Sequence, residues 1–310
     1  MNKPLSFSLL AVLLLAACGG PTASPTPSGG PTGSPGPTGS HGPSPTPSPS
    51  PTPTFGADQI SHPTGGADLV LQMEQGGGLM GWGFFITQAP SFSLYGDGTV
   101  IFQPSGAATR LVGAGLPPFR QARMSEEQVQ ALLRFALGQG RLLGARASYG
   151  QMGCADCGST VFKINAADIS KTISIDALGM AEVPADSADR AGFMALAETL
   201  GGFEARMDAG EMGEVTTYDP PVYRVVMLEA QPGQGEPIAW PWTDVAWEDF
   251  ASVEQGFQLE AVLTREQVAQ VVEVPSGGHN GIIVEAPNDK LWSLGVRPLL
   301  PDEIAAAGQG

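Results

Sequence analysis

The chain has 310 residues, of which 31 are acidic and 15 are basic, so it carries a formal charge of −16. Nucleic acids and anionic membrane surfaces are bound largely by Lys and Arg side chains that neutralise phosphate. The acidic composition therefore argues against a nucleic-acid partner and favours a surface that keeps the protein in solution by charge repulsion.

The N-terminus has the pattern of an export signal. Lys3 precedes an apolar run over residues 5–17, which is too short to span a bilayer as a permanent helix. Residues 15–18 read Leu-Ala-Ala-Cys, which resembles the lipobox of bacterial lipoproteins. The resemblance implies that residues 1–17 are a signal peptide and that Cys18 carries a lipid after cleavage. The alternatives are an ordinary secretory signal and a short buried helix.

A segment of unusual composition follows the lipobox. Residues 19–54 are almost entirely Pro, Ser, Thr and Gly, with no Asp, Glu, Lys or Arg. Such a segment buries too little apolar surface to fold, and Pro-rich chain extends by about 3.1 Å per residue. We therefore predict a disordered stalk over residues 18–54. Loss of Lys3 with the signal peptide leaves 14 basic residues against 31 acidic ones, a formal charge of −17.

Short alternating runs predict strands in the first part of the remaining chain. Leu69, Leu71 and Met73 alternate with other side chains, as in a strand that is buried on one face. A turn at residues 96–98 predicts a hairpin. The paired strands predicted further along the chain are residues 91–95 with 99–103 and residues 159–165 with 171–176.

Two helices are predicted in the same part. Ser125 and Gln128 form the pattern of a capping box, in which each side chain bonds the backbone N–H of the other residue. Helically spaced apolar residues follow, and the helix is expected to end near Gly138 or Gly140. A second helix is predicted over residues 185–200. The apolar residues at helical spacing are Val129, Leu132, Leu133, Ala136 and Leu137 in the first helix, and Phe193, Leu196 and Leu200 in the second.

The last part of the chain repeats some of these signals. A strand is predicted over residues 223–229, and a hairpin over residues 281–285 and 291–296. Residues 264–268 echo the capped helix start at residues 125–129. An internal duplication is an open alternative, because capped helices also recur by chance.

The elements together predict an α+β fold, built mainly from antiparallel sheet with two or three packed helices. Residues 55–212 are assigned to a first α+β unit. Residues 213–310 are assigned to a second, smaller unit that packs on the first. Whether the two are weakly similar halves is left open.

Four features resemble a family of uncharacterised bacterial cell-surface lipoproteins. They are the lipobox, the Pro/Ser/Thr stalk, the hairpin Tyr-Gly-Asp-Gly-Thr-Val at residues 95–100 and the ending Arg-Pro-Leu-Leu-Pro-Asp-Glu at residues 297–303. The resemblance covers nearly all of residues 60–305 and implies the fold and an extracytoplasmic location. It implies no activity, because its motifs are turns and caps. The chain departs from the family by carrying Cys154 and Cys157.

The sequence contains few candidates for catalysis. Nucleophile-elbow, zinc-helix, phosphate-loop and dinucleotide motifs are all missing from it. His62 and His279 are expected on the surface or in turns. The acidic pairs at 248–249 and 302–303 have the composition of a glycosidase pair, but adjacent acids on loops are usually only solvated. We therefore expect no enzymatic activity, no cofactor and no metal.

Cys154 and Cys157 are predicted to form a structural disulfide. Export places them in an oxidising compartment, and they are the only thiols left once Cys18 is lipidated. A thiol–disulfide redox protein is the alternative, but it needs the first cysteine at a helix N-terminus. The β-branched run at residues 160–164 predicts a strand after the motif instead. A metal site would need two more ligands.

An aromatic loop contains Trp240, Trp242 and Trp247. Exposed indole rings would contact a protein partner or a sugar face. The alternative, which we favour, is that the rings pack inward as part of a core. Trp82 and Trp292 lie beside strand-like stretches and are expected in the core.

The sequence therefore predicts a non-catalytic, extracytoplasmic binding or envelope-associated module. It is expected to be held to the cell membrane, or to an outer membrane where one exists, by lipid on Cys18. The ligand, a protein or a polysaccharide, is not specified. The alternatives are a redox protein that uses Cys154 and Cys157, and an inhibitor-like protein that presents the loop from Trp240 to Trp247.

Overall fold

The computed structural model describes residues 58–78, 88–104, 119–150, 156–179, 186–208, 213–230, 233, 235–253, 258–272 and 282–308. By its contacts the chain divides into two units, Met1–Pro51 and Thr52–Gly310, and every described residue belongs to the second. The predicted signal peptide, stalk, Cys18, Trp82 and His279 lie outside the described residues. No helix in the described part of the chain is long and apolar enough to cross a membrane.

Fourteen described strands form two sheets, and five described helices accompany them, so the α+β prediction is confirmed. All strand pairs are antiparallel except β5 with β7 and β10 with β13. The first sheet runs in the order β5 (Ser148–Tyr149), β7 (Ile169–Asp176), β6 (Gly158–Ala166), β1 (Leu69–Gly77), β2 (Phe92–Tyr95), β3 (Thr99–Phe102), β4 (Arg120–Arg123) and β8 (Thr216–Thr217). The second runs in the order β10 (Ile238–Ala239), β13 (Ile282–Glu285), β14 (Leu291–Pro298), β9 (Val222–Glu229), β12 (Gln258–Thr264) and β11 (Ala251–Val253).

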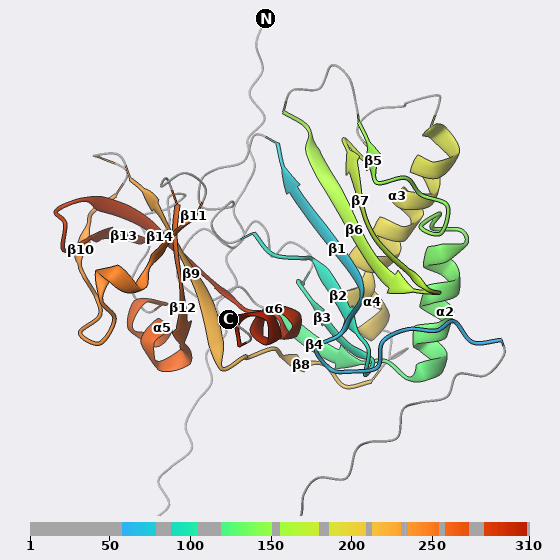
Figure 1. The fold of residues 1–310 in the computed structure, drawn as a ribbon, viewed down its shortest axis with the longest axis horizontal. Helices are drawn as coiled ribbons and strands as arrows, with labels where there is room; N and C mark the ends of the chain where they lie inside the picture. The colour runs from blue at the N-terminus through green and yellow to red at the C-terminus, as the bar shows by residue number, and fades with distance from the viewer. Residues whose placement is uncertain are drawn as a thin grey trace, which may run out of the picture. The chain divides into compact units, whose positions relative to one another are not determined.

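Three helices cover one face of the first sheet, as Figure 1 shows: α2 (Glu126–Leu137), α3 (Ser187–Gly201) and α4 (Phe203–Asp208). Their apolar side chains join the sheet in one buried cluster. The apolar residues that the sequence placed at helical spacing in the first two helices are all buried in this cluster. A buried arginine, Arg190, ties α3 to the sheet by donating to the carbonyl groups of Tyr149, Gly150 and Asp176.

The second sheet is accompanied by α5 (Arg265–Val272) and α6 (Pro301–Ala307). One face of this sheet forms a second buried cluster with Val268 and Val271 of α5. On its other face β9 carries Val226 and Leu228, which form a small separate cluster. β8, which lies beyond the predicted boundary at residue 212, pairs with β4 of the first sheet, and the second sheet begins with β9.

Both predicted capping boxes are present. The Ser125 N–H donates to Gln128 Oε1 at 2.8 Å, and the Gln128 N–H donates to Ser125 Oγ at 3.3 Å. At the start of α5 the Thr264 N–H donates to Gln267 Oε1 at 2.9 Å, and the Gln267 N–H donates to Thr264 Oγ1 at 3.4 Å. Among the described residues, the first and second parts of the chain resemble each other only in these helix starts, because their strands pair differently. In the first sheet β1 pairs with β6, the first strand of its hairpin, whereas β9 pairs with β14, the second strand of its hairpin.

The first strand departs from the predicted simple alternation. Its pairing register with β2 shifts between Leu69 and Leu71, which leaves Val70 as an extra residue. A β-bulge of this kind changes the face to which the following side chains point. Leu69 therefore packs beside Tyr95, whereas Val70 and Leu71 both enter the main core. The prediction of a strand buried on one face is wrong here, because the bulge interrupts the alternation.

The hairpin at residues 96–98 needs glycine at both ends. Gly98 has a φ of 85°, a left-handed conformation that favours glycine, and a Cβ there would approach Met124 O at 2.5 Å. A Cβ on Gly96 would clash with the carbonyl oxygen of Pro63. The predicted turn therefore also serves as a point of close backbone contact with the segment before β1.

The C-terminal segment is tied to the first sheet and its flanking residues. The Tyr95 hydroxyl donates to Asp302 Oδ1 at 2.7 Å, and the Tyr218 hydroxyl donates to Leu299 O at 2.7 Å. Leu300 is buried in a small cluster with Tyr95. Burial and the neighbouring Asp302 charge raise the pKa of Tyr95 far above its usual range, so it stays protonated as a donor. The expectation that the acids at 302–303 are only solvated is therefore wrong for Asp302.

Replacing Tyr95 by phenylalanine should lower the free energy of unfolding by about 1.5–3 kcal/mol, because a hydrogen bond to a charged acceptor is lost. The measurement is urea denaturation of the full-length protein. Tyr218→Phe is the matched control, since its hydroxyl donates to a neutral carbonyl, and it should cost about 0.5–1.5 kcal/mol. Equal losses for the two variants would contradict the assigned role of the Asp302 charge.

Candidate functional site

The aromatic loop packs largely inward. Trp242 is buried, and its indole N–H donates to Gln267 O at 2.8 Å. Trp240 is half-buried, and its indole N–H donates to Val245 O at 3.0 Å. The rings of Trp240 and Trp242 meet edge to face with their centroids 5.0 Å apart. Trp247 is half-buried and stands 5.2 Å from the ring of the buried Trp292, centroid to centroid.

These contacts are those of a core. Trp242, Phe250 and Trp292 belong to the buried cluster of the second sheet, and Trp240 and Trp247 pack against it. The interpretation of inward packing therefore accounts for the position of all three residues that the sequence offered as ligand contacts.

The cysteine motif is described only at its second residue. Cys157 is disulfide-bonded. Cys18 and Cys154 lie outside the described residues, so the pairing of Cys154 with Cys157 stays a prediction. Cys157 comes directly before β6, so the residue after it begins a strand. The helix that would follow the motif in a thiol–disulfide enzyme is therefore not found at this position.

His62 is buried, contrary to the expectation of a surface histidine. Its Nδ1 lies 2.6 Å from Pro63 O, and its Nε2 lies 3.3 Å from Glu126 Oε1. Both ring nitrogens therefore face oxygen acceptors, and the side chain ties the segment before β1 to the first turn of α2. These contacts give His62 a structural role.

A cavity of about 630 Å³ lies beside the hairpin turn at Asp97. Asp97 Oδ1 accepts the Thr99 N–H at 2.9 Å, and Arg123 lies 3.4 Å from the other carboxylate oxygen. Ser125 is used in the helix cap. Asp97, Arg123 and Ser125 are therefore engaged in holding the turn and the helix start. The residues that line it are Gln59, Thr64, Gly96, Asp97, Gly98, Arg123, Met124, Ser125, Glu126 and Val129.

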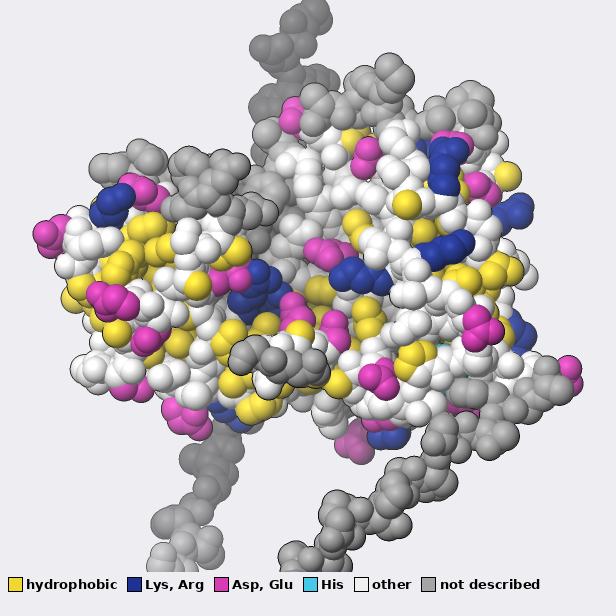
Figure 2. Space-filling view, viewed as in Figure 1, with side chains coloured by type: hydrophobic (Ala, Val, Ile, Leu, Met, Phe, Trp, Pro, Cys, Tyr) yellow, Lys and Arg dark blue, Asp and Glu magenta, His cyan; other side chains and the backbone are white. Residues whose placement is uncertain are grey.

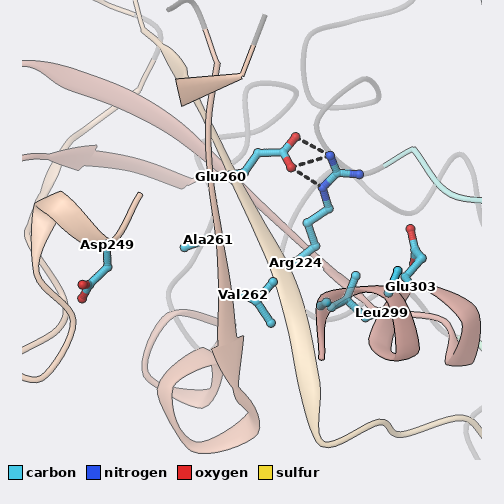
Figure 3. Close-up of a pocket in the computed structure, with 9 residues that line it drawn as sticks. Arg224, Asp249, Glu260, Ala261, Val262, Leu299 and Glu303 are labelled. Carbon is cyan, nitrogen blue, oxygen red and sulfur yellow. Dashed lines mark hydrogen bonds and ion pairs between the residues drawn. The ribbon is translucent and has the colours of Figure 1, made fainter. Parts of the chain in front are cut away.

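A second cavity, of about 420 Å³, lies between β12 and α6, and we call it the β12–α6 cleft. Five of its lining residues are small or aliphatic and four are charged. Asp249 lies on one side of β12, whereas Val262, Leu299 and Glu303 lie on the other (Figure 3). The residues that line the cleft are Arg224, Asp249, Glu260, Ala261, Val262, Leu299, Glu303, Ala306 and Ala307.

One charged pair in the cleft joins two neighbouring strands. Arg224 of β9 donates through Nε to Glu260 Oε2 at 2.7 Å, and its terminal nitrogen contacts both oxygens of the same carboxylate. Gln258 also donates to Glu260. Figure 3 shows the guanidinium and the carboxylate pointing toward each other across the strands. Forked contacts of this kind fix the position and the orientation of the two groups.

A second charged pair, Arg297 with Glu303, lies next to the first. Arg297 of β14 is opposite Arg224 in the register of the two strands, so two cationic side chains share one position of the sheet. Arg297 is buried and donates to Glu303 at 2.5 and 2.8 Å. Like charges opposite each other in a sheet destabilise it unless they are compensated. Glu260 and Glu303 provide one carboxylate for each arginine.

The environment of Glu303 keeps it ionised. Burial raises its pKa, but the hydrogen bonds and the charge of Arg297, with the Leu300 N–H and the charge of Arg224, outweigh burial. The pKa of Glu303 therefore lies below its ordinary value of 4.5. A carboxylate held in this way serves as a fixed negative charge and not as a proton donor near neutral pH.

The sequence alone did not identify this cleft. Arg224, Glu260 and Arg297 come from three strands, and only the pairing register brings them together. The one available signal was a charged side chain, Arg224, at an alternate position of the strand at residues 223–229.

Comparison with known proteins found no matching family model, no similar curated protein and no similar solved structure.

Proposed function

We propose that this chain is a lipid-anchored extracytoplasmic protein whose folded part binds a ligand in the β12–α6 cleft and does no chemistry there. The observation that carries the proposal is the make-up of the cleft. Small apolar side chains line much of it, and its arginine is held by a glutamate through Nε and one terminal nitrogen. Apolar pockets with a few fixed polar groups are typical of binding sites.

The side chains of the cleft support binding more than catalysis. Among the described residues that line it there is no Ser, Cys, Lys or His. Catalysis by a hydroxyl, thiol, amine or imidazole nucleophile needs one of these side chains, and general acid catalysis by a carboxyl group is favoured by a raised pKa. The pKa of Glu303 is shifted in the opposite direction.

The acidic surface bears on the class of partner that the protein binds. Acidic side chains are spread over the face seen in Figure 2. Three of the four charged residues that line the cleft are acidic as well. A nucleic acid or an anionic polysaccharide would be repelled by such a surface, whereas a cationic or neutral partner would not.

Changing Cys18 to serine should abolish labelling of the protein by a palmitate analogue and move it from the membrane fraction to the soluble fraction. The reason is that the thioether-linked lipid needs the cysteine thiol, and anchoring needs more than one acyl chain. Ser6→Ala, which changes the signal region but leaves the thiol in place, is the control. A serine variant that is still labelled would contradict the anchoring proposal.

The binding proposal is tested by site-specific photocrosslinking of the full-length protein in its native membrane. A Val262→p-benzoylphenylalanine variant places the crosslinker in the cleft, and Leu143→p-benzoylphenylalanine is the control at an exposed residue outside it. The expected result is a discrete adduct from position 262 and none from position 143. Equal adducts from both positions, or none from position 262, would contradict binding in the cleft.

A further inference from the structure

The outer edge of β12 is only partly covered. β12 spans Gln258–Thr264, but its edge neighbour β11 has three residues and pairs only with the first three residues of β12. The remaining four residues of β12 have no strand on their outer side among the described residues. The other three sheet edges in the described part are formed by β5, β8 and β10, which have two residues each.

One hydrogen bond shows which residues of β12 direct their backbone N–H and C=O groups toward β9 and which direct them outward. The Arg265 N–H donates to Pro221 O at 3.2 Å, which continues the ladder between β12 and β9. Successive residues of an antiparallel strand direct their backbone groups to alternate edges. Ala261 and Leu263 therefore face β9, whereas Val262 faces outward.

The outward backbone groups of Val262 are open to pairing. Glu260 and Gln258 also face outward, but they lie opposite Ala251 and Val253 of β11. The Thr264 N–H is bonded to the side chain of Gln267. The Val262 N–H and C=O have no hydrogen-bond partner among the described residues. A strand edge with free donors and acceptors accepts an added strand readily.

The β12–α6 cleft reaches this edge. Side chains of neighbouring strand residues point to opposite faces, and the cleft is lined by both Ala261 and Val262. Asp249, which also lines the cleft, lies on the other side of β12 from Val262 in Figure 3, so the cleft extends along the edge of the strand. Val262 is also 51 % exposed, and Leu143 is the only other large hydrophobic residue that is exposed in the described part of the chain.

We propose that the cleft binds an extended, basic segment of a partner protein, which adds as a strand beside Val262 and places a lysine or arginine near Asp249. This rests on the proposed binding function and names its ligand class. The open backbone groups provide the main-chain hydrogen bonds, and alternate side chains contact Val262 and the alanines of α6.

The charge of the cleft selects a basic segment. Among the described residues that line it, Glu260 is paired with Arg224 and Glu303 with Arg297, whereas Asp249 forms no ion pair with a described residue. A second copy of this chain would bring another strongly acidic surface to the same edge. Like-charge contacts of this kind disfavour an association of two copies.

The test uses the full-length mature protein in lipid nanodiscs and short fluorescent peptides. The first peptide alternates lysine with valine, the second replaces lysine by glutamate, and the third is the lysine peptide with N-methyl groups on alternate residues. Fluorescence anisotropy measures the affinity. The lysine peptide should bind, and the other two should bind at least about tenfold more weakly, because one lacks the charge and the other lacks backbone donors.

Variants of the protein place the binding at β12. Val262→Lys should weaken binding of the lysine peptide by about tenfold or more through like-charge repulsion. Val262→Thr, which keeps a β-branched residue of similar size, should change it little. Circular dichroism checks that both variants are folded.

Three results would overturn this inference. One is equal binding of the N-methylated peptide, another is equal binding of the glutamate peptide, and the third is a Val262 photoadduct made only with a second copy of the chain. If no peptide binds but position 262 still crosslinks to another molecule, the proposed binding function stands and the ligand class is wrong. If neither is seen, both are wrong.

Discussion

Replacing Trp242 by alanine is expected to lower the free energy of unfolding by about 3–5 kcal/mol, which is the usual cost of truncating a large buried aromatic residue. The ring is 4 % exposed and packs against Trp240 and Phe250. The indole N–H also donates to Gln267 O at 2.8 Å, so the change leaves a carbonyl of α5 without its partner. Urea denaturation of the full-length protein measures the loss.

Leu143→Ala is the control for Trp242, because Leu143 is 53 % exposed and its truncation should change stability by less than about 0.5 kcal/mol. The size of the Trp242 effect decides between the two interpretations of the aromatic loop. A loss below about 1 kcal/mol would contradict the assignment of the ring to the core and would return the loop to the candidates for partner binding.

Replacing Arg297 by alanine is expected to cost about 3–4 kcal/mol of unfolding free energy, as removal of one partner of a buried ion pair does. The Arg297 side chain is only 4 % exposed, and Glu303 would lose both of its guanidinium hydrogen bonds. The matched control is Lys290→Ala. Lys290 and Glu229 form a pair that is about half exposed, which should be worth less than about 1 kcal/mol.

The pair of Arg297 and Glu303 makes the free energy of unfolding sensitive to acid. Because the pKa of Glu303 is lowered in the folded state, its contribution is fully present above the ordinary value of 4.5 and is lost as the pH falls through the folded-state pKa. The stability difference between the native protein and a Glu303→Gln variant should therefore shrink below pH 4.5. A difference that grows on acidification would contradict the ion pair.

The elements with strong local signals could be predicted from the sequence. The capping boxes at Ser125 and Thr264 need only residues three positions apart, so local sequence determines both helix starts. The hairpin around Asp97 depends on Gly98, whose positive φ the turn itself requires. The helix over Ser187–Gly201 follows from apolar spacing, which its burial confirms.

Elements that depend on distant partners could not be predicted. The edge strands β5, β8, β10 and β11 have two or three residues each, too few for a periodic pattern. The bulge at Val70 arises from the register between two strands and leaves no mark on the alternation itself. The sequence predicted a solvated Asp302, because its partner, Tyr95, lies 207 residues away in the chain.

The candidate site is the clearest example of this limit. Val262 occupies an unremarkable position in an alternating strand, and its importance comes from the short length of β11 beside it. Arg224 and Arg297 become neighbours only through the pairing of β9 with β14. The aromatic loop gave the stronger sequence signal, but large apolar rings are equally suited to a core, and that is where they lie.

Amide hydrogen exchange at Val262 tests the role of this strand edge most directly. In the free full-length protein the Val262 N–H should exchange faster than those of Ala261 and Leu263, which face β9. The lysine–valine peptide should slow exchange at Val262, and its N-methylated form should not. A Val262 amide that is already protected without the peptide, or that stays unprotected when the peptide is bound, would contradict strand addition at this edge.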